Sequence, residues 1–266
     1  MQQTLRLSIF ITAFVSGLAC SSISSRDRQP AADAPLPPRT QLWDVVQKCV
    51  SQAGTADFAL PCVQIDPTGL LVLKDIKSSS HFLVVPTTPV SGIEDPKIFS
   101  SQAPNYWQKA WETRLEVKKS VNRDLPDHVM GYAINPVFAR SQDHFHIHID
   151  CLHRDVVEEL KKRRAQITND WGTSIVLHGG TYQVKFLAKP DLKKTNPFQL
   201  LADQLSPEEQ IGYYTLVIIA AEKNPDFPDG FYLLKAQGLP NDPAHRVHGE
   251  DVEDLKCQLA SDYKEI

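Results

Sequence analysis

The stretch His144-Phe145-His146-Ile147-His148-Ile149-Asp150 carries the main structural signal of this chain, because histidine alternates with apolar residues along it. In a β-strand, successive side chains point to opposite faces, so residues two apart share a face. The pattern therefore predicts a strand with three imidazoles in a row on one face and apolar side chains on the other. A row of imidazoles has little packing value, but it can bind a metal or attack a phosphate ester.

The whole chain has the composition of a globular protein. It has 266 residues, of which 42% are hydrophobic, and a formal net charge of −4. This length allows one large domain or two small ones with a sizeable core. Nucleic-acid binders are usually basic, so the charge argues against nucleic acid as a partner.

Residues 1–20 have the pattern of an export signal. Arg6 precedes an apolar run that ends at Cys20 and is short for a membrane span, which needs roughly 20 residues. Residues 17–20 are similar to a bacterial lipoprotein cleavage site, although Gly17 stands where a larger aliphatic residue is usual. Lipid attachment at Cys20, simple cleavage and an uncleaved anchor remain open, and each predicts export. Residues 21–40, rich in Ser, Pro and Ala, predict a flexible tether before a folded domain at 41–266.

The predicted domain contains four cysteines, which are Cys49, Cys62, Cys151 and Cys257. In an exported chain this number predicts two disulfides, for which three pairings exist. Pairing Cys49 with Cys62 is favoured because it closes a short loop, and it leaves Cys151 for Cys257. The second bond would attach the C-terminal helix to the histidine strand. The alternative is four buried free thiols.

Hydrophobic periodicity predicts helices and strands in alternation. Helices are expected at residues 42–50, 106–121, 155–167, 198–205 and 251–259, the second capped by Asn105 and the third by Asp155. The buried face of the second helix is expected to carry Trp107, Ala110, Trp111 and Leu115. Besides the histidine strand, strands are expected at 62–65, 70–73, 81–85, 129–134, 182–188, 213–221 and 231–236. Meandering strands with intervening helices indicate an antiparallel α+β domain, extended by a C-terminal α/β half.

Two kinds of chemistry fit the histidine row. His-x-His on a strand supplies zinc ligands in several enzymes, and Asp150 would lie on the same face, but the spacing of His153, His178, His245 and His248 selects none as a further ligand. Alternatively, a neutral imidazole can displace a leaving group from phosphorus and form a phosphoramidate that water hydrolyses. Neighbouring imidazoles can then donate hydrogen bonds to the phosphoryl oxygens.

The motif and its surroundings resemble the histidine triad (HIT) family of nucleotide hydrolases and transferases. Asn135 ends the preceding strand, and Ser141 stands three residues before His144, as in that family. One branch, the bacterial CDP-diacylglycerol pyrophosphatases, is similar over roughly residues 41–260. The segments that carry this similarity are 48–50, 72–75, 83–87, 131–135 and 141–151, with Cys62 and Cys257. Two departures are Arg140, in place of the usual Gln of a Gly-Gln-Ser run, and Asp150, where an aliphatic residue is common.

The resemblance implies a HIT-like antiparallel sheet and a role for each site residue. His146 would be the nucleophile, forming a cytidylyl-histidine intermediate as phosphatidate leaves CDP-diacylglycerol, and water would then release CMP. His148 would contact the phosphoryl oxygens, and His144 would tune His146. Ser141 would contact phosphate, and Asn135 would lock the active-site loop.

The resemblance also places Lys74 and Asp75 near the nucleoside, with Asp75 on a ribose hydroxyl. It implies no metal and no cofactor. The expected location is the periplasmic side of the bacterial inner membrane, where a tethered domain meets a lipid substrate at the bilayer surface. A zinc-dependent hydrolase and a non-catalytic nucleotide- or lipid-binding lipoprotein remain the alternatives, and the oligomeric state remains open.

Overall fold

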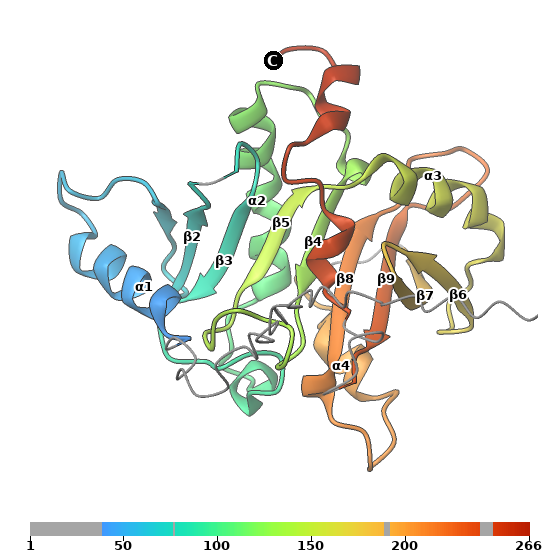
Figure 1. Cartoon of the computed structure of the whole chain (residues 1–266), viewed down its shortest axis with the longest axis horizontal. Helices are drawn as coiled ribbons and strands as arrows, with labels where there is room; N and C mark the ends of the chain where they lie inside the picture. The colour runs from blue at the N-terminus through green and yellow to red at the C-terminus, as the bar shows by residue number, and fades with distance from the viewer. Residues whose placement is uncertain (1–38, 77, 189–191, 240–246) are drawn as a thin grey trace, which may run out of the picture. The chain divides into compact units, whose positions relative to one another are not determined.

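The computed structural model describes residues 39–76, 78–188, 192–239 and 247–266 (Figure 1). Pro38–Ile266 forms one compact unit, so Arg39 and Thr40 belong to the folded domain rather than to the expected tether. The Arg39 carbonyl accepts a hydrogen bond from the Asp143 backbone N–H (2.7 Å), and its guanidinium pairs with the Asp143 carboxylate (3.3 Å). The expected signal with Cys20, the rest of the tether and His245 lie outside the described residues. None of the helices in those ranges is long and apolar enough to cross a membrane.

An antiparallel sheet of nine strands forms the centre of this unit. The strands are β1 Cys62–Ile65, β2 Leu70–Lys74, β3 Phe82–Pro86, β4 Met130–Ile134, β5 Ile147–Cys151, β6 Thr173–Leu177, β7 Gly180–Ala188, β8 Tyr214–Ala220 and β9 Gly230–Gln237. Their order is β1-β2-β3-β5-β4-β8-β9-β7-β6, so β5 lies in the interior between β3 and β4. The sheet and its helices confirm the expected α+β class.

The helices are α1 Gln41–Gln52, α2 Tyr106–Val121, α3 Arg154–Arg163 and α4 Pro197–Ala202. Short 3-10 helices are η1 Pro96–Phe99, η2 Asp127–Val129, η3 Arg164–Gln166, η4 Ile211–Tyr213, η6 Gly249–Val252 and η7 Gln258–Asp262. Asn105 caps α2 as expected, because its side chain accepts a hydrogen bond from the Gln108 N–H (3.0 Å). Leu115 was expected on the buried face of α2 but is 47% exposed, and Thr113 and Val117 are buried instead.

The two faces of the sheet are covered differently, and this difference positions the histidines. On one face α2 packs against β3 and β5, in a core that includes Phe145, Ile147 and Ile149. On the other face α1 packs on β2 and β3, while α3 and η6 lie over β4 and β8 (Figure 1). The histidine side of β5 lies between these two covers, where His146 and His148 are 6% and 7% exposed.

Several expectations about individual elements were wrong. The histidine strand begins only at Ile147, so His144 and His146 lie in the extended segment before β5. Strand β6 was not anticipated, and the C-terminal half extends the same antiparallel sheet instead of forming an α/β unit. Asp155 lies in the first turn of α3, and His153 occupies the N-cap position.

The expected final helix is replaced by η6 and η7. Between them, Glu253 forms a β-bridge with Leu152 at the end of the histidine strand. Cys257 has a φ of 46°, in the left-handed region that an α-helix cannot include. A continuous helix at 251–259 would break both features.

The structure contains both expected disulfides, Cys49–Cys62 and Cys151–Cys257. The first joins α1 to β1. The second joins the end of β5 to the start of η7, and so attaches the C-terminal segment beside the histidines.

Removing the Cys151–Cys257 bond should destabilise the fold more than removing Cys49–Cys62. The sequence separation is 106 for Cys151–Cys257 and 13 for Cys49–Cys62. From the loop entropy of the unfolded chain, removing the first bond should lower the free energy of unfolding by about 4–5 kcal/mol and removing the second by about 3 kcal/mol. Urea unfolding of the Cys151→Ala/Cys257→Ala and Cys49→Ala/Cys62→Ala variants measures both losses. Equal losses, or the reverse order, would contradict this account.

Candidate active site

His146 is a buried imidazole with one nitrogen fixed as a donor. It is 6% exposed, and its Nδ1–H donates to the carbonyl oxygen of His144 (2.6 Å). Burial, followed by repulsion from His148, lowers the pKa of His146 to about 3. The ring is therefore neutral near pH 7, and with the proton on Nδ1 its Nε2 carries a free lone pair. This is the protonation state that a nucleophilic imidazole needs.

The depressed pKa of His146 predicts a pH-dependent stability difference. The unfolded chain binds a proton at this ring below about pH 6.5, whereas the folded chain does not until about pH 3. The stabilising contribution is therefore complete above pH 6.5 and is lost on acidification, by about 1.4 kcal/mol per pH unit. Urea unfolding from pH 7 to pH 4 should show the wild type losing stability relative to His146→Asn. A pH-independent difference would contradict the assigned pKa. All other titrating groups are the same in the wild type and the variant, so their effects cancel in the difference.

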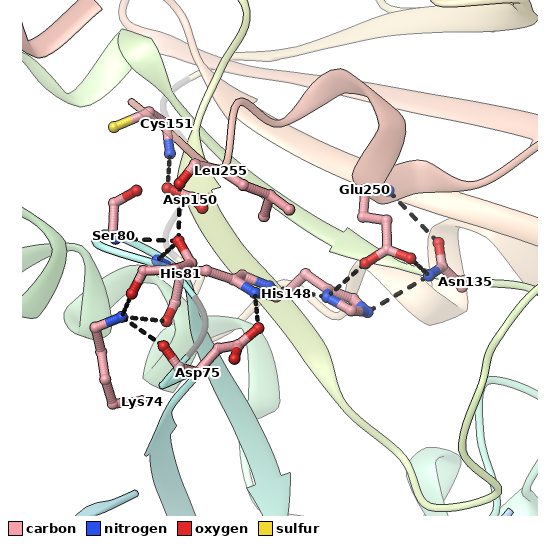
Figure 2. A network of polar contacts seen from close by, with 11 residues as sticks. Lys74, Asp75, Ser80, His81, Asn135, His148, Asp150, Cys151, Glu250 and Leu255 are labelled. Carbon is pink, nitrogen blue, oxygen red and sulfur yellow. Dashed lines mark hydrogen bonds and ion pairs between the residues drawn. The ribbon is translucent and has the colours of Figure 1, made fainter. Parts of the chain in front are cut away.

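His148 is held by a network of polar side chains (Figure 2). Its Nδ1 lies 3.0 Å from Glu250 Oε2, and Asn135 Nδ2 donates to Glu250 Oε1 (3.0 Å). Asn135 Nδ2 also lies 3.4 Å from His148 Nε2. Attraction to His148, together with hydrogen bonds, holds the pKa of Glu250 well below its ordinary value, so this carboxylate is charged. A carboxylate bound to one ring nitrogen fixes the orientation of the ring, and with it the direction in which the other nitrogen points.

A second chain of contacts reaches His148 from β3. His81 Nδ1–H donates to Asp75 Oδ2 (3.2 Å), and His81 Nε2 lies 3.0 Å from His148 Nδ1. His81 is buried, and burial lowers its pKa. Asp75 therefore reaches the triad through His81.

The C-terminal segment delivers Glu250 to this network. Asn135 Oδ1 accepts the Gly249 N–H (2.8 Å), which joins the end of β4 to the start of η6. A Cβ at Gly249 would collide with the Thr215 hydroxyl and press on Ala133, so only glycine allows this close approach. Asn135 therefore fixes a segment that lies more than a hundred residues away in sequence. Its expected role in locking an active-site loop stays a prediction.

His144 contributes to the site through its backbone more directly than through its ring. Its carbonyl fixes His146, while its Nε2–H donates to the Pro86 carbonyl (2.8 Å) and its ring packs on Trp43 of α1, with centroids 4.9 Å apart. Ser141 is exposed on the loop before the triad, and within the described residues no hydrogen bond joins its side chain to these rings. Its phosphate contact stays a prediction.

Lys74 and Asp150 flank the network. The Lys74 ammonium donates to the carbonyls of Asp75 (2.8 Å), Ser78 (2.6 Å) and His81 (3.2 Å), so it holds the loop before β3 in place. Its contact with a nucleoside stays a prediction. Asp150 is fully buried, and burial raises its pKa to about 7.

Arg140, one of the two departures from the family pattern, is buried and paired with two carboxylates. It is 7% exposed and forms a two-pronged ion pair with Glu94 (2.6 and 2.8 Å) and a further pair with Asp143 (3.0 Å). These bonds fix the loop that leads into the triad.

Two groups in the described ranges have the residue types and spacing of metal ligands. One is buried and comprises His81, His148 and Glu253, and the other is exposed and comprises His153, Asp155 and His178. In each, one ligand atom per residue lies within 4.8 Å of the others.

Sequence reasoning missed His81, Glu250 and Glu253. His81 was assigned to a strand without a chemical role, and its position seven residues after Lys74 carries no motif. Glu250 was overlooked, and the spacing of His248, two residues before it, did not select it as a site residue. His248 is half-buried, with Nδ1 3.8 Å from Glu250 Oε1. The Gly249-Glu250 pair after a histidine was the available signal, but only the sheet topology brings it to the triad.

The fold and the site together define an α+β protein with a cluster of buried histidines beside a charged glutamate. A family model of CDP-diacylglycerol pyrophosphatase matches residues 37–261. A CDP-diacylglycerol pyrophosphatase of Yersinia pestis is 33% identical over 225 residues, which are 82% of this chain and 84% of that protein. The chain belongs to the CDP-diacylglycerol pyrophosphatase family.

Proposed function

We propose that this enzyme hydrolyses the pyrophosphate bond of CDP-diacylglycerol to CMP and phosphatidate through a covalent intermediate on His146. Family membership supports the substrate and the overall reaction. The observation that supports the covalent step is the hydrogen bond from His146 Nδ1 to the His144 carbonyl, because it leaves Nε2 unprotonated. We also propose that the sheet and the histidines are of the histidine triad type.

In the first step, the Nε2 lone pair of His146 attacks the cytidylyl phosphorus. The bond from this phosphorus to the bridging oxygen breaks, and phosphatidate leaves with that oxygen and its electron pair. In the second step, water attacks the same phosphorus and releases a proton to solvent, and the P–N bond electrons return to Nε2 as CMP leaves. His148, oriented by Glu250 and Asn135, is placed to stabilise the phosphoryl oxygens.

Asp75 and Ser141 are proposed to contact the ribose and the phosphate. The contact of Asp75 with His81 places its carboxylate at the edge of the histidine cluster. Ser141 directly follows Arg140, whose ion pair with Glu94 holds the loop backbone in place. The Ser141 hydroxyl therefore projects from a fixed position.

We further propose that residues 1–20 export the chain and that the domain acts at the periplasmic face of the inner membrane. The support is the apolar run ending at Cys20 and the lipid nature of the proposed substrate. Metabolic labelling with a radioactive fatty acid separates the anchoring routes, because label that disappears in Cys20→Ala identifies lipidation.

Hydrolysis in ¹⁸O-labelled water tests the proposed reaction. The protein as isolated should convert CDP-diacylglycerol to equal amounts of CMP and phosphatidate, with the label in CMP. Release of CDP, or label in phosphatidate, would place the attack at another phosphorus and contradict the proposal. Absence of any product would favour a non-catalytic binding protein.

A further inference from the structure

Glu253 is a buried carboxylate with no hydrogen-bond partner in the described part of the chain. The residue is 4% exposed, and neither of its carboxylate oxygens has a partner among the described residues. Its backbone is fixed by the bridge to Leu152, and its side chain passes over Gly131 of β4. An unpaired carboxylate is strongly disfavoured in an interior unless it takes up a proton or binds a cation.

Two imidazole nitrogens lie beside this carboxylate. His81 Nε2 and His148 Nδ1 are 3.0 Å apart, with ring planes only 3° from parallel. One carboxylate oxygen of Glu253 lies within 4.8 Å of a ring nitrogen of His81 and of a ring nitrogen of His148. The three residues come from separate parts of the chain, before β3, in β5 and after η6.

We propose that His81, His148 and Glu253 bind one first-row divalent cation, with zinc as the best match. Two imidazoles and a carboxylate are a common ligand set for zinc, and ligand atoms of a tetrahedral zinc site lie about 3.3 Å apart. The two nitrogens are already near this separation, and rotation of the Glu253 side chain brings in the third ligand. Glu250 Oε2, 3.0 Å from His148 Nδ1, is placed to become the fourth.

The cation would balance the charge of Glu253, whose burial otherwise has no compensation in the described part of the fold. It would also fix the ring of His148 beside His146, where the ring centroids are 4.7 Å apart. This second consequence rests on the proposed function, whereas the binding of the cation does not.

The experiment must separate this site from the exposed group of His153, Asp155 and His178. The full-length chain is therefore prepared without a histidine tag, in the His178→Ala background. It is depleted with chelator and then dialysed against zinc alone. Elemental analysis gives the stoichiometry, and thermal unfolding gives the stabilisation.

The His178→Ala protein should bind one zinc per chain. At a hundredfold excess over the dissociation constant its melting temperature should rise by about 5–10 °C. Adding Glu253→Gln should abolish both effects without lowering the melting temperature of the metal-free protein, because glutamine has the shape of a protonated, neutral glutamate. His81→Ala is a second test of the same loss, and Glu208→Gln, an exposed residue, is the control.

The same measurement on His146→Asn separates this inference from the proposed function. One zinc per chain in that variant is expected, whatever its activity. No zinc bound to His178→Ala, or binding that survives both Glu253→Gln and His81→Ala, would overturn the proposal. In that case a proton or a water would be the partner of Glu253.

Discussion

Replacing His146 with asparagine should reduce the release of CMP from CDP-diacylglycerol by on the order of 10⁴–10⁶-fold, the range seen when a nucleophile is removed. The asparagine amide can take the place of Nδ1 and keep the hydrogen bond to the His144 carbonyl. The substitution removes Nε2, the attacking atom, together with ring carbon Cε1. Product formation under single-turnover conditions measures the loss.

Two measurements exclude loss of folding as the cause of a reduced rate. At pH 7 the variant should give the wild-type circular dichroism spectrum, and its urea unfolding transition should stay cooperative. Near-normal activity in a folded His146→Asn protein would show that this imidazole is not the nucleophile.

Replacing Glu250 with glutamine should lower kcat by about 10–100-fold and leave KM nearly unchanged. The substitution removes the charge that orients His148 through Nδ1, a contact of 3.0 Å. Hydrogen bonds to charged groups contribute about 1.5–3 kcal/mol, which corresponds to this change in rate. Steady-state kinetics separates kcat from KM.

Asp251→Asn is the matched control, because Asp251 lies on the same 3-10 turn and is exposed. It should retain wild-type kinetics. Equal losses in both variants would mean that the turn, rather than the Glu250 carboxylate, matters. A change in KM alone would mean that Glu250 contributes to binding but does not position His148.

The parts of the fold that local patterns determine were predictable from the sequence. The helix capped by Asn105 begins and ends where the periodicity placed it, and apolar alternation put Phe145, Ile147 and Ile149 in one core. The export signal and the even number of cysteines predicted two disulfides, and both are present. In each case neighbouring residues or a simple count carried the information.

The parts that depend on distant segments were not predictable. Glu250 and Glu253 lie about a hundred residues after the triad, and only the antiparallel order of the sheet brings them to His148. The same contacts explain the wrong final helix, since Glu253 is held extended against Leu152. Arg140 could not be assigned either, because its partner Glu94 comes from a loop with no motif.

The central claim is a covalent bond between His146 and the cytidylyl phosphorus, and its most direct test is rapid acid-free quenching with CDP-diacylglycerol labelled at that phosphorus. We expect label on the protein within one turnover, and peptide mass spectrometry should find one cytidylyl group on His146. The label should be absent from His146→Asn. Turnover that releases CMP with no protein-bound label, or label on another residue, would contradict the account.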